Sequence, residues 1–132
     1  GTLEHVFNIP NALKTIEDLL KIDGVIFHNN PSNGWLDHGF YQFSPTFYHD
    51  YYRVNKFKLI SNNLNNYLIG LQTYDVSKDL YRKVSPFFRI YNFQRATITF
   101  SAQKKEEKTR QIFPTQGYYK EMHNDYSSEN YN

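Results

Sequence analysis

Histidines and the carboxylates and aromatic rings near them are the side chains of this sequence that could do chemistry. Histidine suits proton transfer because its unperturbed pKa lies near neutrality. His28 ends an apolar run, and His38 follows ten residues later with Asp37 directly before it. Asp37 could fix the tautomer of the His38 imidazole, or the two side chains could diverge. His28 could enter a cleft or be a hydrogen-bonded core histidine.

The residues between 29 and 43 form a long polar and aromatic loop, and long ordered loops tend to be functional. Asn29 and Asn30 are candidates for binding a substrate, or they satisfy the last backbone groups of the preceding strand. Trp35 and Tyr41 could form a flat wall for a substrate ring, or they could cover the core. We expect this site just past the carboxyl end of the strand that precedes the loop.

Two helices and a strand must position that loop. The apolar spacing predicts a helix over residues 8–21, with Asn8 as its N-cap and Pro10 in its first turn. It should stop at Asp23-Gly24, where we expect glycine's conformational freedom to be needed. The continuous apolar run over residues 25–28 predicts a strand covered on both faces. Ser44-Pro45 predicts the start of the second helix, and the tyrosines after it predict its buried side.

The second half of the chain contains the clearest strand. Residues 95–103 alternate between apolar and polar side chains, which predicts a strand of the main sheet. The remaining segments have weaker patterns, and we interpret them as follows: a strand from 57 to 60, an asparagine-rich turn over 62–66, a strand or hairpin return over 67–73, an ambiguous stretch over 75–92, a solvated strand end over 104–110, and an apolar stretch over 112–119 that folds back onto the domain.

Composition limits the possible functions. The 132 residues suffice for one domain, and the net charge of +2 without a basic stripe argues against nucleic-acid binding. The chain has no cysteine, which excludes disulfides and thiolate chemistry. No apolar run reaches the roughly 18 residues of a membrane span, and no secretion signal is visible. We therefore expect a cytoplasmic protein that binds neither nucleic acid nor a membrane.

Several short motifs, taken in order, resemble the second half of a class I S-adenosylmethionine-dependent methyltransferase. They are Leu3-Glu4-His5-Val6, Leu19-Leu20-Lys21, Asp23-Gly24-Val25-Ile26-Phe27, His38-Gly39, Phe43-Ser44-Pro45, Asn55-Lys56-Phe57, and Ala96–Ala102 followed by Gln103-Lys104. The resemblance covers roughly residues 1–105, and we interpret residues 106–132 as a polar tail that is partly packed back. Lys56 replaces a glycine of the family pattern, so we expect Asn55 to manage that turn.

The resemblance implies the carboxyl-terminal half of a Rossmann-like α/β fold. It implies a mixed sheet with an antiparallel last strand and helices packed on the sheet, with the strands at 25–28, 96–102 and 57–60 adjacent in that order. The strand at 25–28 would leave its outer edge exposed, so we expect marginal stability or self-association. No G-x-G spacing exists among the six glycines, so the family's cofactor-binding loop has no counterpart here. We expect the missing amino-terminal half of the fold to be a partner.

The resemblance also implies the chemistry. S-adenosylmethionine would be the cofactor, with Glu4 and His5 beside it; His5 could instead be a local cap. His5, His28 and His38 are then the candidate catalytic residues of a methyltransferase that acts on a small molecule or a glycan. We expect this chain alone to be inactive.

Two other functions remain open. The first is a non-catalytic, aromatic-rich module that binds carbohydrate through Trp35, Tyr41 and the tyrosines at 48–52; burial of these rings would favour the enzyme. The second is a degenerate chain that serves only as a partner of another protein. Histidines 28, 38 and 49 with Asp37 and Asp50 match no zinc spacing, so we expect no metal site.

Overall fold

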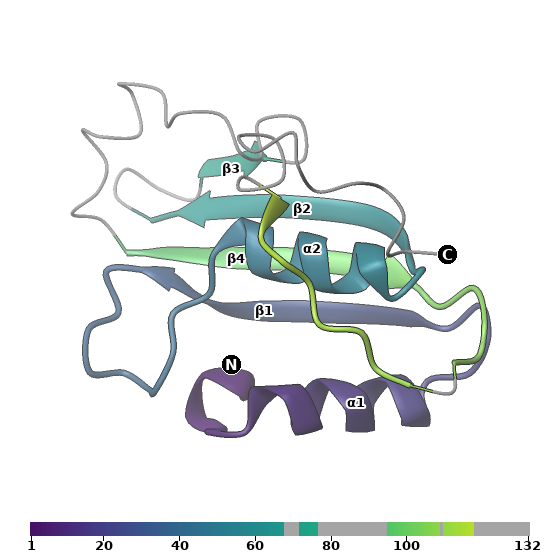
Figure 1. Ribbon diagram of the computed structural model, residues 1–132. Helices are drawn as coiled ribbons and strands as arrows, with labels where there is room; N and C mark the ends of the chain where they lie inside the picture. The colour runs from purple at the N-terminus through teal and green to yellow at the C-terminus, as the bar shows by residue number, and fades with distance from the viewer. Residues whose placement is uncertain (68–71, 77–94, 109, 118–132) are drawn as a thin grey trace.

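The computed structural model describes residues 1–67, 72–76, 95–108 and 110–117 (Figure 1). Its elements are η1 (Leu3–His5), α1 (Ile9–Leu19), β1 (Val25–Asn33), α2 (Pro45–Val54), β2 (Lys58–Asn66), β3 (Gln72–Asp75) and β4 (Ala96–Gln103). They form a mixed α/β fold with an open, four-stranded antiparallel sheet and two α-helices. The predicted α/β class is therefore confirmed at this level.

The sheet has the strand order β1-β4-β2-β3. β4 lies between β1 and β2 and pairs with both in antiparallel fashion. The predicted adjacency of β1, β4 and β2, in that order, is thus confirmed, and so is the prediction that the last strand, β4, is antiparallel to its neighbours. The predicted mixed sheet is not observed among the described residues. β1 and β2 do run in the same direction, but β4 separates them, so every described hydrogen-bonded pair is antiparallel.

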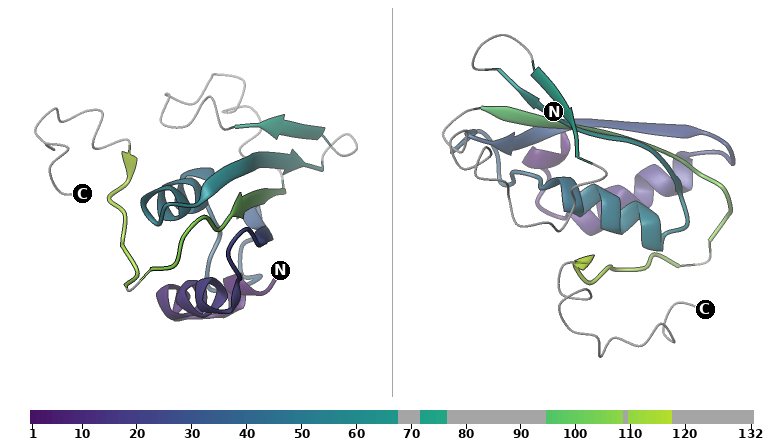
Figure 2. Two further views of the ribbon diagram at one scale, coloured as in Figure 1. Left: turned by 90° about the vertical axis from the view of Figure 1, so that its right-hand side faces the viewer. Right: turned by 90° about the horizontal axis from the view of Figure 1, so that it is seen from above.

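Both α-helices pack on one face of the sheet (Figure 2). The prediction that residues 25–28 are covered on both faces is wrong: Val25 is 53% and Phe27 63% exposed, whereas His28 is buried. These two apolar side chains point to the face opposite the helices, and no described helix covers that face. The apolar run therefore forms an edge strand with one buried face.

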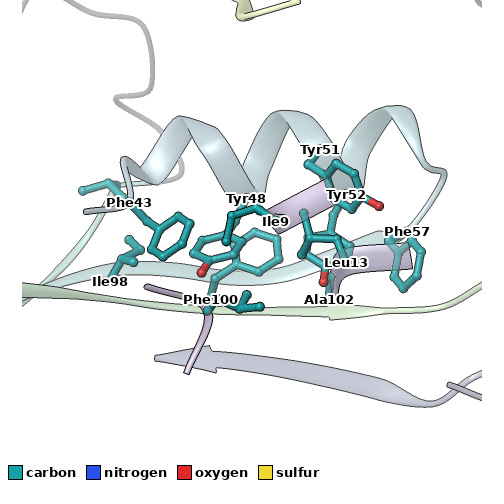
Figure 3. Packing of buried hydrophobic residues seen from close by; sticks show 12 residues of the cluster. Ile9, Leu13, Phe43, Tyr48, Tyr51, Tyr52, Phe57, Ile98, Phe100 and Ala102 are labelled. Carbon is teal, nitrogen blue, oxygen red and sulfur yellow. The ribbon is translucent and has the colours of Figure 1, made fainter. Parts of the chain in front are cut away.

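The core lies between α2 and the centre of the sheet (Figure 3). Ile98, Phe100 and Ala102 of β4 are fully buried, which confirms the alternation predicted for that strand. Tyr48 and Tyr52 of α2 are also fully buried, and their rings stack on Phe100 with centroids 5.6 and 5.2 Å apart. The tyrosine-rich side of α2 is thus the main apolar face of the helical layer.

The helix starts follow the predicted caps. The Asn8 side chain accepts a hydrogen bond from the backbone N–H of Asn11 at 3.2 Å, with Pro10 in the first turn of α1. The Ser44 hydroxyl accepts from the backbone N–H of Thr46 at 3.3 Å, with Pro45 opening α2. α1 ends at Leu19, two residues earlier than predicted.

Among the described residues, no helix is both long and apolar enough to cross a membrane.

Two turns use residues other than the predicted ones. After α1 the left-handed residue is Asp23, with φ 61°, and Gly24 is required for space: an added Cβ would lie 2.8 Å from the Lys21 carbonyl oxygen. After α2 the left-handed residue is Lys56, with φ 59°, whereas Asn55 has φ −85°. The expectation that Asn55 adopts the left-handed conformation at this turn is wrong. Its buried side chain instead forms hydrogen bonds with Ile112, as described below.

Two strands are longer than predicted. β1 continues through Asn33 with an irregularity between Pro31 and Asn33, so the connecting loop starts at residue 34. Residues 62–66, predicted as a turn, are the last part of β2. The predicted hairpin return corresponds to β3, which pairs with β2; residues 68–71 lie outside the described residues. So does most of the ambiguous stretch, because residues 77–94 are not described.

The chain after β4 returns to the helices, and we call residues 110–117 the strap. The strap lies on the side of α2 away from the sheet (Figure 2). The Asn55 amide donates to the Ile112 carbonyl at 2.9 Å, and the Ile112 N–H donates to the Asn55 side-chain oxygen at 3.0 Å. Gln111 donates to the Pro10 carbonyl and to the Tyr51 hydroxyl, both at 2.7 Å. Asn55 is therefore the anchor of the strap.

Lys104 departs from the prediction of a solvated strand end. Its side chain is 5% exposed. Its ammonium donates hydrogen bonds to the carbonyls of Glu17 and Leu20, at 2.9 and 2.8 Å. A cation there complements the partial negative charge of carbonyls at a helix C-terminus. Lys104 thus joins the end of β4 to the end of α1.

Candidate functional site

A buried carboxylate, that of Glu4, lies at the centre of the candidate site. Its side chain is 1% exposed, and its Oε2 accepts a hydrogen bond from Asn30 Nδ2 at 2.7 Å. The Glu4 carbonyl accepts hydrogen bonds from the backbone N–H groups of Phe40 and Tyr41, at 2.7 and 3.3 Å. These bonds join η1, β1 and the loop that follows β1.

Two imidazoles face the other carboxylate oxygen. Nε2 of His5 lies 3.8 Å, and Nε2 of His38 3.9 Å, from Glu4 Oε1. The two rings are tilted toward each other with centroids 5.3 Å apart. His5 is 51% and His38 46% exposed at the side chain, so solvent reaches both imidazoles. The structure thus brings together the Glu4-His5 pair and a histidine more than thirty residues later.

Trp35 supports the His38 side of this cluster. Its ring lies 5.1 Å from the His38 ring, and its indole N–H donates to the Ala96 carbonyl at 2.9 Å. The Arg95 guanidinium lies over the same indole, 5.1 Å from the centroid. Trp35 is half-buried by these contacts and links the loop to the start of β4.

The Glu4 carboxylate is held in its ionised form. Burial acts to raise the pKa of Glu4, but hydrogen bonds from its own backbone and from Asn30, together with the positive charges of the amino terminus and of His5, outweigh burial, so the pKa lies below its usual value. The ionised carboxylate is therefore ready to attract a proton or a cation between the two imidazoles. This attraction is strong because the carboxylate is almost completely removed from water.

Asn30 lies behind Glu4 in a chain of buried hydrogen bonds. The Tyr48 hydroxyl donates to Asn30 Oδ1 at 2.6 Å, and the Asn30 amide donates to Glu4. Both polar ends of the Asn30 side chain are thus occupied, and the side chain is buried. This arrangement favours a supporting role for Asn30 over direct contact with a substrate.

His28 lies apart from the cluster, in the core. Its Nε2 is 2.6 Å from the Tyr52 hydroxyl, and its ring stacks on Tyr48 with centroids 4.5 Å apart. Burial lowers the pKa of His28 to about 4, so this imidazole is neutral near pH 7. These contacts favour the alternative of a hydrogen-bonded core histidine; its catalytic role stays a prediction.

The other predicted site residues surround the loop. Asn29 is exposed at the edge of the sheet. Asp37 is exposed with φ 61°, so it forms the turn before His38, and the carboxylate that lies against the His38 ring is that of Glu4. The Tyr41 hydroxyl donates to the Phe7 carbonyl at 2.9 Å. Their roles in substrate binding stay predictions.

An apolar groove of about 590 Å³ lies beside the cluster, between the two helices and under the strap. Its lining includes residues of α1, α2, the loop and the strap, namely Ile9, Leu13, Tyr41, Phe47, Tyr51 and Phe113. Tyr41 belongs to both places, because its backbone N–H donates to the Glu4 carbonyl and the residue also lines the groove. The groove could accept an apolar part of a ligand.

The sequence did not indicate that Glu4 and His38 meet. The adjacent Asp37 is the local signal for His38, and the histidines that the sequence suggests as its partners at a metal are His28 and His49. His49 is on α2, with its Nδ1 3.1 Å from Asp50, and His28 is in the core. The histidine at the end of the Leu-Glu-His segment is the one local signal for the cluster that Glu4, His5 and His38 form.

Comparison with known proteins gives no relative: no family model, no curated protein and no solved structure matches this chain.

Proposed function

We propose that this chain is the acceptor-side half of an S-adenosylmethionine-dependent methyltransferase that acts on a small molecule or a glycan. The observation that carries the proposal is the position of β4, which lies between β1 and β2 and is antiparallel to both. The motif resemblance implies the same arrangement of strands from the sequence alone. If the motifs resembled the family only by chance, the strand order that they imply would not be expected to match the strand order of the sheet.

The arrangement of the site is consistent with this chemistry. Methyl transfer from a sulfonium is an in-line displacement, so a protein mainly positions the donor and the acceptor and excludes water. His5 and His38 lie side by side at the carboxyl end of β1 and are accessible. In the proposal, one of these imidazoles accepts the proton of the acceptor, and the ionised Glu4 stabilises the imidazolium that forms.

The cofactor would be held largely by residues outside this chain, since the glycine-rich loop has no counterpart in the sequence. In the proposal, Glu4 and His5 are this chain's contribution to the cofactor side. His38 with Trp35 and Tyr41 is its contribution to the acceptor side. The missing half of the fold would pair along the outer edge of β1.

The carbohydrate-binding module is less well supported. Its stacking surface required accessible aromatic rings, whereas Tyr48, Tyr51 and Tyr52 are buried in the core. Trp35 is also engaged, between the His38 ring and the Arg95 guanidinium. Burial of these rings favours the enzyme half.

The first test is calorimetric titration with S-adenosylmethionine of this chain alone and of a parent polypeptide that adds the proposed missing half. We expect micromolar binding by the parent and none by the chain alone. Micromolar binding by the chain alone would overturn the half-domain proposal, and so would the absence of binding by the parent.

The second test measures transfer of a labelled methyl group by the parent to small-molecule and glycan acceptors. A general base typically contributes about 100-fold or more, so His38→Ala should lower the rate by at least that factor. Lys14→Ala, on the exposed side of α1, is the matched control and should keep full activity. Unchanged rates in both His5→Ala and His38→Ala would contradict the assigned roles.

A further inference from the structure

We infer that Glu4 Oε1, His5 Nε2 and His38 Nε2 form a binding site for a divalent transition-metal ion. One ligand atom from each of these three residues lies within 4.8 Å of the ligand atoms of the other two. The two contacts to the carboxylate are 3.8 and 3.9 Å, longer than direct hydrogen bonds. The inference does not depend on methyl transfer and departs from the expectation that this chain has no metal site. An Nε2 atom that binds a metal cannot also accept the proton of an acceptor, so the metal-bound state and the proposed general-base state are alternatives.

The donor set determines the class of metal. Two imidazole nitrogens and one carboxylate oxygen suit Zn²⁺, Co²⁺, Ni²⁺ or Fe²⁺. Calcium and magnesium prefer ligand sets made of oxygen atoms alone, so they are poor candidates. One negative charge from Glu4, buried next to two neutral imidazoles, would leave a bound divalent ion with a net positive charge. Such an ion attracts anionic or oxygen ligands.

Only small movements would close the site. Ligand atoms on a tetrahedral zinc ion lie roughly 3.3 Å from one another, so each imidazole Nε2 has to approach Glu4 Oε1 by roughly 0.5 Å. The ligand nitrogens of the two histidines have to approach each other by at most about 1.5 Å. The half-exposed side chains of His5 and His38 have room to rotate. The buried carboxylate is fixed by its hydrogen bonds, so the histidines would move toward it. A rigid anion with two adjustable neutral ligands is a feasible arrangement for binding a metal.

A supporting set of hydrogen bonds orients the carboxylate. Asn30 binds Oε2 of Glu4, which leaves Oε1 directed at the histidines, and Tyr48 in turn fixes Asn30. Outer hydrogen bonds of this kind are characteristic of metal sites, where they orient the ligands. The loop that carries His38 is fixed as well, because the Phe40 N–H donates to the Glu4 carbonyl. The ligands are thus held from both sides.

The proposed site keeps at least one open coordination position. Three protein ligands do not complete a tetrahedral shell, and the imidazoles of His5 and His38 are half-exposed to solvent. A water molecule or an oxygen atom of a substrate would complete the coordination. This is the pattern of a site that acts on a ligand, in contrast to a closed structural site.

The experiment is a titration of the full chain with Co²⁺ alone, followed by its visible absorption, with Zn²⁺ added afterwards as a competitor. We expect d–d bands at one equivalent of Co²⁺ and their loss on addition of Zn²⁺. His5→Ala and His38→Ala should each weaken Co²⁺ binding by on the order of 100-fold or more, because loss of an outer-shell partner alone costs about 10- to 100-fold. Both side chains are half-exposed, so the variants should fold, which circular dichroism checks.

His49→Gln is the matched control, since it removes a histidine on α2 and should leave Co²⁺ affinity unchanged. Paramagnetic shifts of the imidazole protons in Co²⁺-loaded protein provide a second measurement, and they should fall on His5 and His38. The inference is overturned if the wild-type chain shows no d–d bands, or if His5→Ala and His38→Ala bind Co²⁺ as the wild type does. Neither result would bear on S-adenosylmethionine binding by the parent, so the two proposals fail separately.

Discussion

Gly39 lies directly against the backbone of Glu4: a Cβ placed on Gly39 would be 2.8 Å from the Glu4 carbonyl oxygen and 3.1 Å from its carbonyl carbon. The same oxygen accepts the hydrogen bond from the Phe40 N–H at 2.7 Å. The loop after β1 can approach η1 this closely only because residue 39 has no side chain. The distance between His38 and Glu4 depends on this contact.

Gly39→Ala should therefore separate the loop from η1. We expect an unfolding free energy lower by about 1–3 kcal/mol, because a methyl group is forced against backbone, and weaker Co²⁺ binding. Urea denaturation and the cobalt titration measure the two effects. Leu36→Ala, at an exposed position of the same loop, is the control and should change neither quantity. Wild-type cobalt affinity in Gly39→Ala would contradict the role of this contact.

The Tyr48-Asn30-Glu4 chain should act as a unit. Asn30→Ala leaves the Glu4 carboxylate without its buried donor, and we expect a loss of about 2–3 kcal/mol. Tyr48→Phe leaves only the Asn30 oxygen unpaired, and about 1–2 kcal/mol should be lost. Urea denaturation of both variants and the double variant gives a double-mutant cycle. Strictly additive losses would argue against coupling.

His28 should make stability depend on pH. Burial lowers its folded-state pKa to about 4 from the ordinary 6.5, so the unfolded chain takes up a proton first as the pH falls. The unfolding free energy should decrease by about 1.4 kcal/mol per pH unit across this window, or roughly 3 kcal/mol in total. Urea denaturation at several pH values measures this slope. In His28→Gln the slope should be smaller by the contribution of one proton, about 1.4 kcal/mol per pH unit. Equal slopes in the two proteins would refute the assignment.

Lys104 and Lys105 are adjacent but should differ in importance. Lys104→Met removes two hydrogen bonds to the carbonyls at the end of α1, and we expect a loss of about 1–3 kcal/mol. Lys105 makes an exposed ion pair with Asp23, so Lys105→Met should change stability by less than about 1 kcal/mol. Thermal unfolding of both variants measures the difference. Similar losses in the two variants would show that the buried bonds of Lys104 contribute little.

The outer edge of β1 should promote association of this chain with itself. Val25 and Phe27 are exposed on this edge strand, and unpaired strand edges tend to pair with other chains. Sedimentation velocity should show concentration-dependent association that Phe27→Lys weakens. Ile60→Lys is the control, because Ile60 is a similarly exposed apolar residue on the inner strand β2, and this change should have less effect. A monomeric wild-type chain at all concentrations would contradict this prediction.

The sequence by itself determined the elements whose signals are local. The caps Asn8 and Ser44 set the starts of both helices, and the alternation in residues 96–102 set which face of β4 is buried. These features depend on residues one to four positions apart, so a single sequence contains the whole signal. The order of β1, β4 and β2 also followed from the sequence, through the resemblance of the motifs.

Tertiary structure decided the features that depend on distant residues. The hydrogen bonds of Lys104 to the end of α1 and the proximity of His38 to Glu4 depend on the conformations of the connecting loops. The periodicity of the sequence does not indicate those conformations. The exposure of Phe27 was similarly hidden, because an apolar run looks the same whether one or both faces of its strand are covered. The sequence therefore supplied the carboxylate and the imidazoles, and the contact between η1 and the loop placed them at one point.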